Sequence, residues 1–351
     1  MSVMASQAKS VTLWLPELLV PLSSSDLPET DVKALHVPAL RTLLSRADAF
    51  PAKTQTFHET ASYLFHQTQT LPVASVMASV QLPDYDADAF WLRAEPCQVI
   101  PDRDTLVMIP PGDLAVTETE SKALLEAFNA HFAEDGVQLE YAGATDWYLR
   151  IAQPVDLQST PLSRAAYQNI NPHYPKGNAA GYWHQLMNET QMLFFTHPVN
   201  EARRERGWPE INSLWFWGEG RLAVDQVEFR PQAKIWSQDA YLQGLANLAQ
   251  AGYSPQPKNY QAWSESALST KGGFAHHLLH LTMPTAGQQT QTEWLAGLQT
   301  LEKTWFEPLL LAVKNQDIDS LFIDVGLPKR YHLKPKHLRR FWRRKKSLAR
   351  L

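Results

Sequence analysis

The sequence predicts an α/β fold in which short apolar strands alternate with amphipathic helices. The chain has 351 residues, enough for one large domain that carries a smaller inserted domain. Hydrophobic residues make up 44% of it and it contains 12 Trp, so it can bury a sizeable core. An acidic, turn-rich segment at Pro83–Asp88 marks the point where the insert is expected to begin.

The elements of the larger domain follow from apolar runs and helical spacing. An apolar run at Val11–Leu15 predicts the first strand, and Pro- and Ser-rich turns extend from there to Pro28. Apolar residues at helical spacing predict helices at Val37–Arg46 and Phe57–Phe65. The elements expected after the insert are a helix at Gln238–Ala251, a strand at Ala275–Leu281, a helix at Thr292–Lys314 and a strand at Ser320–Val325.

The insert is expected to mix strands and helices in an α+β arrangement. Its strands are predicted at Ala89–Arg93, Leu106–Ile109, Val137–Tyr141 and Trp147–Ile151. Its helices are predicted at Glu118–Ala133, Tyr182–Phe195 and Asn200–Arg206, with a Pro/Gly/Asn loop at Asn169–Gly181 before the last two. A buried strand at Ile211–Phe216 should then end in a flexible turn at Trp217–Gly220, and ligands of open α/β sheets bind at such carboxyl ends.

Charge is distributed unevenly along the chain. The net charge is −4, yet residues 329–351 form a basic C-terminal tail in which Phe341 and Trp342 lie among Lys and Arg. Such a segment can lie on an anionic membrane surface, bind nucleic-acid phosphate, dock on the protein's own acidic body or remain solvated. No module for sequence-specific nucleic-acid recognition is present. No apolar run is long enough for a membrane span, and no secretion signal precedes the first strand, so a cytoplasmic location is expected.

Side chains able to bind anions gather before the expected strand at Ile211–Phe216. Arg203, Arg204 and Arg206 form a guanidinium cluster of the kind that grips phosphate or carboxylate bidentately. On residue chemistry alone, the pattern favours an ordinary helix, turn and core strand with aromatic packing over a ligand site. His276, His277 and His280 could suggest a metal site, although packing roles are commoner for such residues. The single Cys97 allows no disulfide or thiolate metal site within the chain.

The segment from His197 to Gly220 resembles a motif of the archaeal-type cofactor-independent phosphoglycerate mutases, which are members of the alkaline phosphatase superfamily. The matching residues are Pro198, Val199, Asn200, Arg203, Gly207, Asn212, Trp215, Trp217, Gly218 and Gly220. Phe90–Pro96, Thr117–Gly143 and Val37–Leu44 resemble further parts of that family. Asn188–Leu193, with the following His-Pro-Val-Asn, is similar to a bacterial group described as RpfE-type regulatory proteins.

The resemblance implies an alkaline phosphatase-like three-layer sandwich with an inserted smaller α+β domain. The expected division is residues 1–86 and 205–351 for the core, and 87–204 for the insert with its connecting helices. It also implies a ligand site for a phosphorylated or carboxylated small molecule. The residues expected to form that site are Arg93, Asn200, Arg203 and Asn212, with Trp217, Gly218 and Gly220 shaping its wall. Each of the polar residues could instead pair with an acid or cap a helix. Trp147–Leu149 departs from the mutase pattern, which argues against a phosphoglycerate-specific contact.

Enzymes of this superfamily resemble one another in using two divalent metals, held by Asp and His, and a Ser or Thr nucleophile. This chain has Pro16-Glu17 where the first metal ligand is expected, and His58 in the nucleophile position. Leu279–Gln288 keeps the shape of a later motif and lacks its Asp residues. We therefore expect a pseudoenzyme with a regulatory or ligand-binding role and without catalytic residues or a metal. The alternative is a working phosphoglycerate mutase or phosphatase with Mn or Zn in a rebuilt site. Its candidates are His58, Glu59 and Thr60 for catalysis, and Glu17, His280 and Asp324 for metal.

Overall fold

The structure is a computed structural model that describes residues 9–19, 35–52, 56–223, 227, 233–268, 274–283, 290–343 and 348. The chain divides into two compact units. The first unit comprises Met1–Gln69 and Gln226–Leu351, and the second comprises Thr70–Asp225. The insert is therefore longer than predicted, because residues 70–86 and 205–225 lie with it and not with the core. The reason is local: the helix Val73–Gln81 packs on the sheet of the insert.

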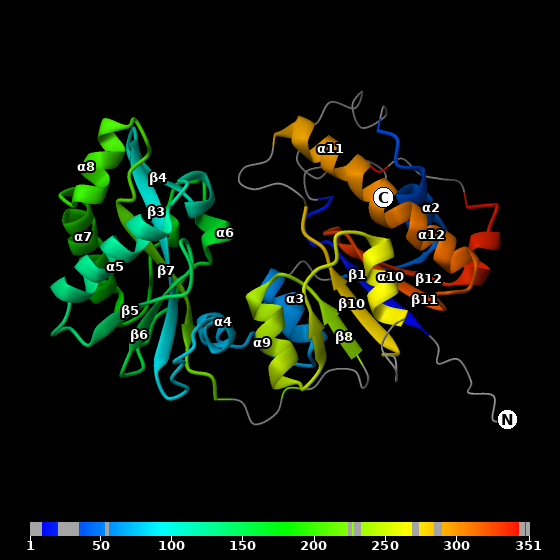
Figure 1. Cartoon of the computed structure of the whole chain (residues 1–351), viewed down its shortest axis with the longest axis horizontal. Coiled ribbons are helices and arrows are strands. Elements are labelled where there is room, and N and C mark those ends of the chain that lie inside the picture. Colours follow the sequence, from blue (N-terminus) through cyan, green and yellow to red (C-terminus); the bar gives the residue numbers. More distant parts are fainter. Residues whose placement is uncertain are drawn as a thin grey trace. The chain divides into compact units, whose positions relative to one another are not determined.

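The first unit is built on a seven-stranded sheet in the order β2-β12-β11-β1-β10-β8-β9 (Figure 1). Its strands are β1 (Ser10–Trp14), β2 (Asp48–Pro51), β8 (Ala233–Trp236), β9 (Gly252–Ser254), β10 (His276–His280), β11 (Ser320–Asp324) and β12 (Lys329–Leu333). The central strands run parallel, and β12 and β2 add an antiparallel edge. The predicted strands at β1, β10 and β11 are confirmed, whereas β2, β8, β9 and β12 were not predicted.

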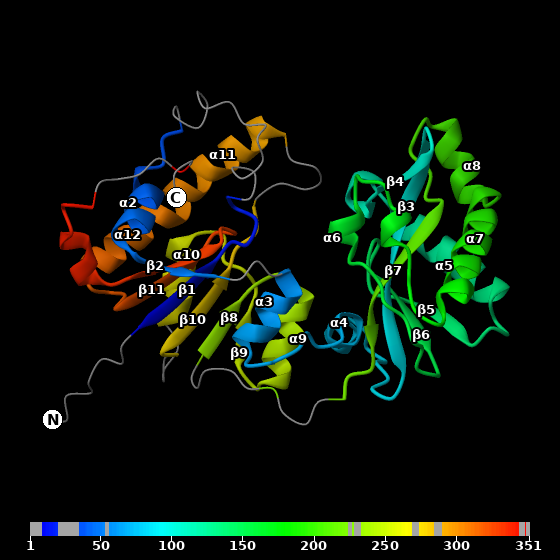
Figure 2. The ribbon, with the colours of Figure 1, turned by 180° about the vertical axis from the view of Figure 1, so that it is seen from behind.

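Helices cover both faces of this sheet, which gives the predicted three-layer sandwich (Figures 1 and 2). The helices of this unit are α2 (Pro38–Arg46), α3 (Phe57–Leu64), α9 (Ala240–Leu248), α10 (Tyr260–Leu268), α11 (Gln291–Leu301) and α12 (Glu307–Lys314). Residues of α2, α11 and α12 pack with Val11, Leu13 and Leu279 in one core on one face. Because neighbouring side chains of a strand point to opposite faces, Trp14 and His280 face the other side, toward α3.

The long helix predicted at Thr292–Lys314 is interrupted. A π-helical turn at Glu302–Phe306 separates α11 from α12, and Pro308 follows at the start of α12. Proline lacks the N–H that would continue the hydrogen-bond ladder, which accounts for the irregular turn. The buried Glu302 carboxylate accepts the backbone N–H groups of Ala39 and Leu40 and thereby caps α2. The interruption therefore places a charged side chain where the neighbouring helix needs an acceptor.

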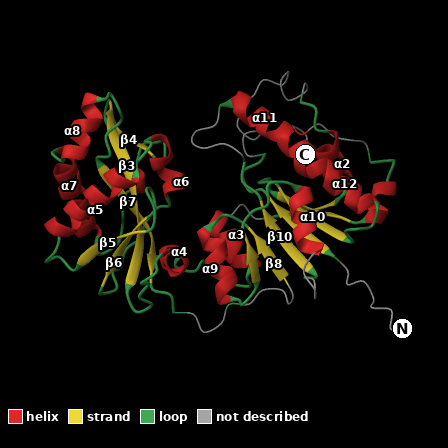
Figure 3. Ribbon diagram, viewed as in Figure 1, coloured by secondary structure: helices red, strands yellow, loops and turns green. Residues whose placement is uncertain are grey.

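The second unit is an antiparallel sheet covered by helices on both faces (Figure 3). Its strands are β3 (Phe90–Asp102), β4 (Thr105–Ile109), β5 (Val137–Tyr141), β6 (Trp147–Ile151) and β7 (Ser213–Gly220). Its helices are α4 (Val73–Gln81), α5 (Glu118–His131), α6 (Leu162–Ala165), α7 (Ala180–Phe195) and α8 (Pro198–Glu205). The remaining short helical turns of the chain lie at Pro111–Asp113, Asn171–His173 and Pro335–Arg339. The α+β character expected of the insert is confirmed by this arrangement.

Trp217–Gly220 belongs to strand β7, so the prediction of a flexible turn there is wrong. Gly218 has φ 73° and Gly220 has φ 147°, and a Cβ at Gly220 would lie 2.6 Å from Pro72 Cβ. A Cβ at Gly218 would lie 3.1 Å from Val73 Cβ. The two glycines thus let the start of α4 approach the strand closely.

Candidate functional site

The carboxyl edge of the core sheet is where the resemblance places catalysis. Strands β1, β10 and β11 are parallel, and Trp14 is in register with both His280 and Asp324. Ligands of α/β sheets bind beyond such carboxyl ends. Of the predicted residues, His280 and Asp324 end their strands here, and Glu17 follows β1 in an exposed turn.

Aromatic rings pack against one another at this edge. Trp14 stacks on Phe57 with a centroid distance of 4.9 Å and an interplanar angle of 3°. The His280 ring lies 5.1 Å from Trp14 and 5.2 Å from Phe57, and His58 lies 5.0 Å from Tyr241. We call these five residues the carboxyl-edge cluster. Trp14 is 1% exposed, His280 is 4% exposed and Tyr241 is buried, whereas Phe57 and His58 are half-buried.

His280 is held as a neutral ring. Its Nδ1 lies 2.8 Å from Ser237 Oγ, and the same oxygen accepts the backbone N–H of Asp239 at 2.9 Å. The Ser237 hydroxyl proton is therefore available to His280 Nδ1. Burial lowers the pKa of His280 to about 4, because a charged imidazole would lose its hydration. His277 lies three residues earlier and thus on the opposite face, and His276 lies four residues from His280, roughly 13 Å along the strand, so the histidines of β10 do not converge on one metal.

The other candidates for catalysis and metal binding have structural partners. Asp324 accepts Arg330 Nε at 2.8 Å and the backbone N–H of Gly326 at 3.2 Å. Glu59 forms a capping box with Thr56 at the start of α3, and Thr60 is buried in the same helix. In the part of the chain that the structure describes, no three His, Cys, Asp or Glu residues are grouped so that they could hold a metal. The described residues thus do not fit the two-metal centre that the resemblance implies.

Arg93 lies in a buried ionic cluster of the insert. Its Nη2 donates to Glu95 Oε1 and to Asp146 Oδ1, both at 2.9 Å, and its guanidinium lies 4.8 Å from the Tyr148 ring centroid. Trp217 Nε1 donates to the second oxygen of Glu95 at 2.7 Å. Arg93 Nε and Nη1 have no acceptor among the described residues. Two carboxylates against one guanidinium leave the cluster negative, which favours a structural role over binding an anion.

Arg203 is fully buried and its donors are engaged. Nε donates to the Pro209 carbonyl at 2.6 Å, Nη1 to Glu120 at 2.9 Å, and Nη2 to the Leu114 carbonyl. Glu120 also forms the capping box that starts α5. Arg203 thus joins α8 to α5 and to the segment before β7. Arg203 and Arg206 both lie against the Trp208 ring, at 5.6 and 5.5 Å from its centroid, whereas Arg204 pairs with Glu210 at 3.2 Å.

Asn200 and Asn212 hold backbone groups in place. Asn200 Nδ2 donates to the carbonyls of Phe194 and Ile211, each at 2.8 Å, and its Oδ1 accepts the Ile211 N–H at 2.9 Å. Asn212 pairs in the same two-way manner with the backbone of Val99. Ligand binding by Arg93, Asn200, Arg203 and Asn212 stays a prediction, and the observed contacts favour the structural interpretation. Cys97 is buried, and burial raises the pKa of its thiol, so it resembles a core residue rather than a nucleophile.

The basic C-terminal segment is attached to the core by its charged side chains. Asp48 contacts Arg340 Nη1 at 2.5 Å, Arg343 Nη2 at 3.1 Å and His337 Nε2 at 3.6 Å. The Arg340 hydrogen bond lowers the pKa of Asp48 to about 2. Phe341 is 81% exposed and Trp342 is 66% exposed, with their rings 5.2 Å apart. No helix among the described residues is long and apolar enough to cross a membrane.

Comparison with known proteins supports the coarse resemblance. No protein-family model matches the chain. A Geobacter sulfurreducens protein named as a probable 2,3-bisphosphoglycerate-independent phosphoglycerate mutase is 30% identical over 43% of this chain and 37% of its own length. Matches to other curated mutases span 42% to 50% of those proteins, so the chain matches half or less of its curated relatives.

Solved structures match over most of the chain. A protein of Pyrococcus horikoshii aligns with 93% of this chain and 86% of its own, at a TM-score of 0.53 and 14% identity. A cofactor-independent phosphoglycerate mutase from Thermoplasma acidophilum aligns over 93% of this chain and 90% of its own, at a TM-score of 0.47 and 14% identity. The chain is thus similar to cofactor-independent phosphoglycerate mutases and has a fold of the alkaline phosphatase type.

Sequence reasoning missed the partners of its own candidates. Glu95 lies two residues after Arg93, on the same face of a strand, so this ion pair could have been found from spacing alone. Ser237, Phe57 and Glu120 lie far along the chain from His280, Trp14 and Arg203, and no local pattern indicates these pairs.

Proposed function

We propose that this chain is a non-catalytic relative of the cofactor-independent phosphoglycerate mutases, with a regulatory role of the kind that its RpfE-type motif suggests. One observation carries the proposal: the carboxyl-edge cluster lies at the position at which the resemblance expects metal and nucleophile. Phosphoryl transfer with two metals needs charged ligands whose lone pairs face an open site. Here the corresponding edge presents packed rings instead.

The chemistry of the individual candidates supports the same conclusion. His280 Nδ1 is occupied by Ser237, and Asp324 is occupied by Arg330. Metal binding by Asp324 would compete with its ion pair to Arg330, and metal binding by His280 through Nε2 would require the Ser237 hydroxyl to accept from Nδ1 instead of donating to it. To bind a metal, Glu59 would have to give up its capping hydrogen bonds at the start of α3. A helix cap typically stabilises a protein by about 1 kcal/mol. No catalytic step is therefore assigned to these side chains.

The test is a turnover assay on the purified full chain. We expect no interconversion of 2- and 3-phosphoglycerate and no hydrolysis of a phosphomonoester, with Mn²⁺ or Zn²⁺ added in excess. If the wild-type preparation shows trace turnover, the His280→Phe preparation should show the same rate, because the activity would come from a contaminating enzyme. Metal-dependent turnover that His280→Phe or Asp324→Asn abolishes would overturn the proposal and establish the rebuilt site.

The basic tail supports a second function, attachment to an anionic membrane surface. The specific observation is that Phe341 and Trp342 project into solvent while Arg340 and Arg343 hold the segment in place. Exposed aromatic rings beside Lys336 and Arg339 suit the interface between lipid headgroups and acyl chains.

Co-sedimentation with lipid vesicles tests this second function. The wild type should bind vesicles that contain phosphatidylserine and not vesicles of phosphatidylcholine alone, and added salt should weaken binding. The double variant Phe341→Ser, Trp342→Ser should lose most of this binding. Phe195→Ser, which removes an exposed aromatic residue of α7, is the matched control and should bind as the wild type does. Equal binding by the double variant would contradict the membrane role.

A further inference from the structure

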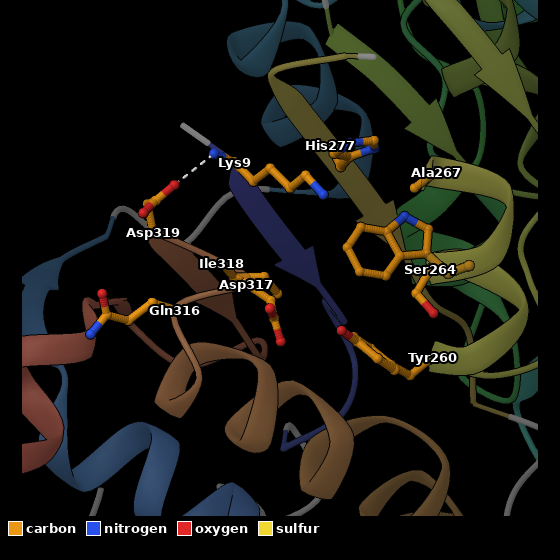
Figure 4. A pocket seen from close by; sticks show the side chains of 10 residues that line it. Lys9, Tyr260, Ser264, Ala267, His277, Gln316, Asp317, Ile318 and Asp319 are labelled. Carbon is orange, nitrogen blue, oxygen red and sulfur yellow. Dashed lines mark hydrogen bonds between the residues drawn. The ribbon is translucent and has the colours of Figure 1, made fainter. Parts of the chain in front are cut away.

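The amino edge of the core sheet holds a cavity of about 580 Å³ (Figure 4). It lies beside the first residues of β1, β10 and β11, and therefore at the opposite edge from the carboxyl-edge cluster. The residues that matter for its chemistry are Lys9, Tyr260, Trp263, Ser264, His277 and Asp317. This volume lies in the range of pockets that bind small molecules, roughly 300–1,000 Å³. We call it the amino-edge pocket.

Aromatic side chains of α10 form the apolar wall of the pocket. Trp263 is 4% exposed, with its ring 5.4 Å from Tyr260 and 5.3 Å from His277 at near right angles. The indole Nε1 of Trp263 is buried and has no hydrogen-bond acceptor among the described residues. A buried N–H without an acceptor is unfavourable, so the wall would be stabilised by a ligand that brings one.

Charged groups of opposite sign line different parts of the pocket. The backbone of Lys9 is fixed by Asp319, which accepts the Lys9 N–H at 2.9 Å and donates its own N–H to the Lys9 carbonyl at 3.0 Å. Figure 4 shows the Lys9 side chain extending toward His277, and the Asp317 carboxylate on the side of the Tyr260 hydroxyl. No ion pair within the described residues involves the Lys9 ammonium or the Asp317 carboxylate.

The pKa shifts of His277 and Tyr260 agree with the placement of Lys9 and Asp317 in different parts of the pocket. Burial lowers the pKa of His277 to about 4, and the positive charge of Lys9 acts in the same direction. His277 is hence neutral at pH 7, and its Nδ1 accepts Trp236 Nε1 at 3.2 Å. Burial raises the pKa of Tyr260, and the negative charge of Asp317 adds to this effect. The charge of Lys9 thus acts on the pKa of His277, and the charge of Asp317 acts on the pKa of Tyr260.

We propose that the amino-edge pocket binds a small zwitterion with an apolar body, of the α-amino acid type. Its carboxylate would contact Lys9 and offer the acceptor that the Trp263 N–H lacks. Its ammonium would contact Asp317, and its side chain would pack on Trp263 and Tyr260. A ligand of single charge would pair with only one of the two charged groups, whereas a zwitterion would pair with both.

Isothermal titration of the full chain with three compounds that share one ring tests the charge requirement. L-phenylalanine carries both charges, phenethylamine carries the ammonium alone, and 3-phenylpropionate carries the carboxylate alone. L-phenylalanine should bind at least roughly tenfold more tightly than either analogue, since one charge-assisted contact is worth a factor of about ten or more. L-leucine serves as a second zwitterion with a smaller body.

Variants of the two charged residues should separate the contacts. Lys9→Met should reduce the affinity for L-phenylalanine to that for phenethylamine and leave phenethylamine binding unchanged. Asp317→Asn should reduce it to that for 3-phenylpropionate. Lys314→Met and Asp104→Asn remove the same charges at exposed positions elsewhere and should change nothing. The proposal is overturned if neither amino acid binds at millimolar concentration. It is also overturned if the single-charge analogues bind as tightly as L-phenylalanine. The same holds if neither Lys9→Met nor Asp317→Asn weakens the binding of L-phenylalanine.

Discussion

At the carboxyl edge of the core sheet, Trp14 lies flat against Phe57 and at a tilt to His280, whereas at the amino edge Trp263 lines a cavity. Both edges bury tryptophan and a neutral histidine. At the carboxyl edge the His280 Nδ1 has a partner and the rings pack on one another. At the amino edge the Trp263 indole N–H lacks an acceptor and charged groups border the cavity. The comparison teaches that buried aromatic residues alone do not distinguish a core from a site. Unsatisfied polar atoms and open volume are the features that distinguish a candidate site from a packed core.

Trp14→Ala should be the most destabilising change at the carboxyl edge. It removes a ring that is almost fully buried and leaves a cavity between Phe57 and His280, at a cost of roughly 3–5 kcal/mol in the free energy of unfolding. Chemical denaturation measures the loss. Trp342→Ala, the same substitution at an exposed position, should cost less than about 0.5 kcal/mol. A cost below about 1 kcal/mol for Trp14→Ala would mean that the stack is not a structural core.

Arg203→Met extends the comparison to the insert. The substitution leaves Glu120 and two backbone carbonyls without their donor in a buried position, and breaking such a pair costs roughly 3–5 kcal/mol. Arg204→Met, at a partly exposed position, should cost no more than about 1 kcal/mol. An Arg203→Met protein that keeps its stability and loses affinity for a phosphorylated compound would favour the ligand site that the sequence predicts.

The two buried histidines should make stability depend on pH. The pKa values of His277 and His280 are lowered from 6.5 to about 4 in the folded protein. Between pH 4 and pH 6.5 the unfolded chain binds more protons than the folded one. The stabilisation that depends on the two neutral histidines is therefore complete above pH 6.5. It is lost as the pH falls toward 4, by on the order of 3 kcal/mol for each histidine. Urea unfolding at several pH values measures the slope, which His280→Phe should reduce by about half. An unchanged slope would mean that folding does not lower the pKa of His280.

Asp48→Asn should have the smallest effect on global stability. The side chain is partly exposed, and removing its charge weakens its contacts with Arg340, Arg343 and His337, for a cost of about 1 kcal/mol or less. The change should be visible locally as faster tryptic cleavage in the segment from Arg339 to Arg343. Because Asp48 has its pKa lowered to about 2, the wild type should show the same loosening only below pH 4. Unchanged cleavage in the variant would show that other contacts hold the tail.

More of the fold than of the candidate site could be predicted from the sequence. Apolar runs were sufficient for β1, β10 and β11, because each has a buried face whose pattern is local. Gly218 and Gly220 were assigned to a turn because their role, close packing on Pro72 and Val73, depends on a helix distant in sequence. The ligand role predicted for Arg203 did not anticipate Glu120, which no spacing rule connects to it. The amino-edge pocket was not predicted at all, since its lining comes from several separate segments.

Titration of the full chain with Mn²⁺ and Zn²⁺, followed by calorimetry and thermal unfolding, tests most directly whether the carboxyl edge is packed core or metal centre. A metal that binds the folded state raises its stability in proportion to the logarithm of metal concentration. We expect no saturable binding at the carboxyl edge and the same melting temperature with and without metal, in the wild type and in His280→Phe alike. Two equivalents of metal that raise the melting temperature of the wild type, and fail to do so in His280→Phe and Asp324→Asn, would contradict the account.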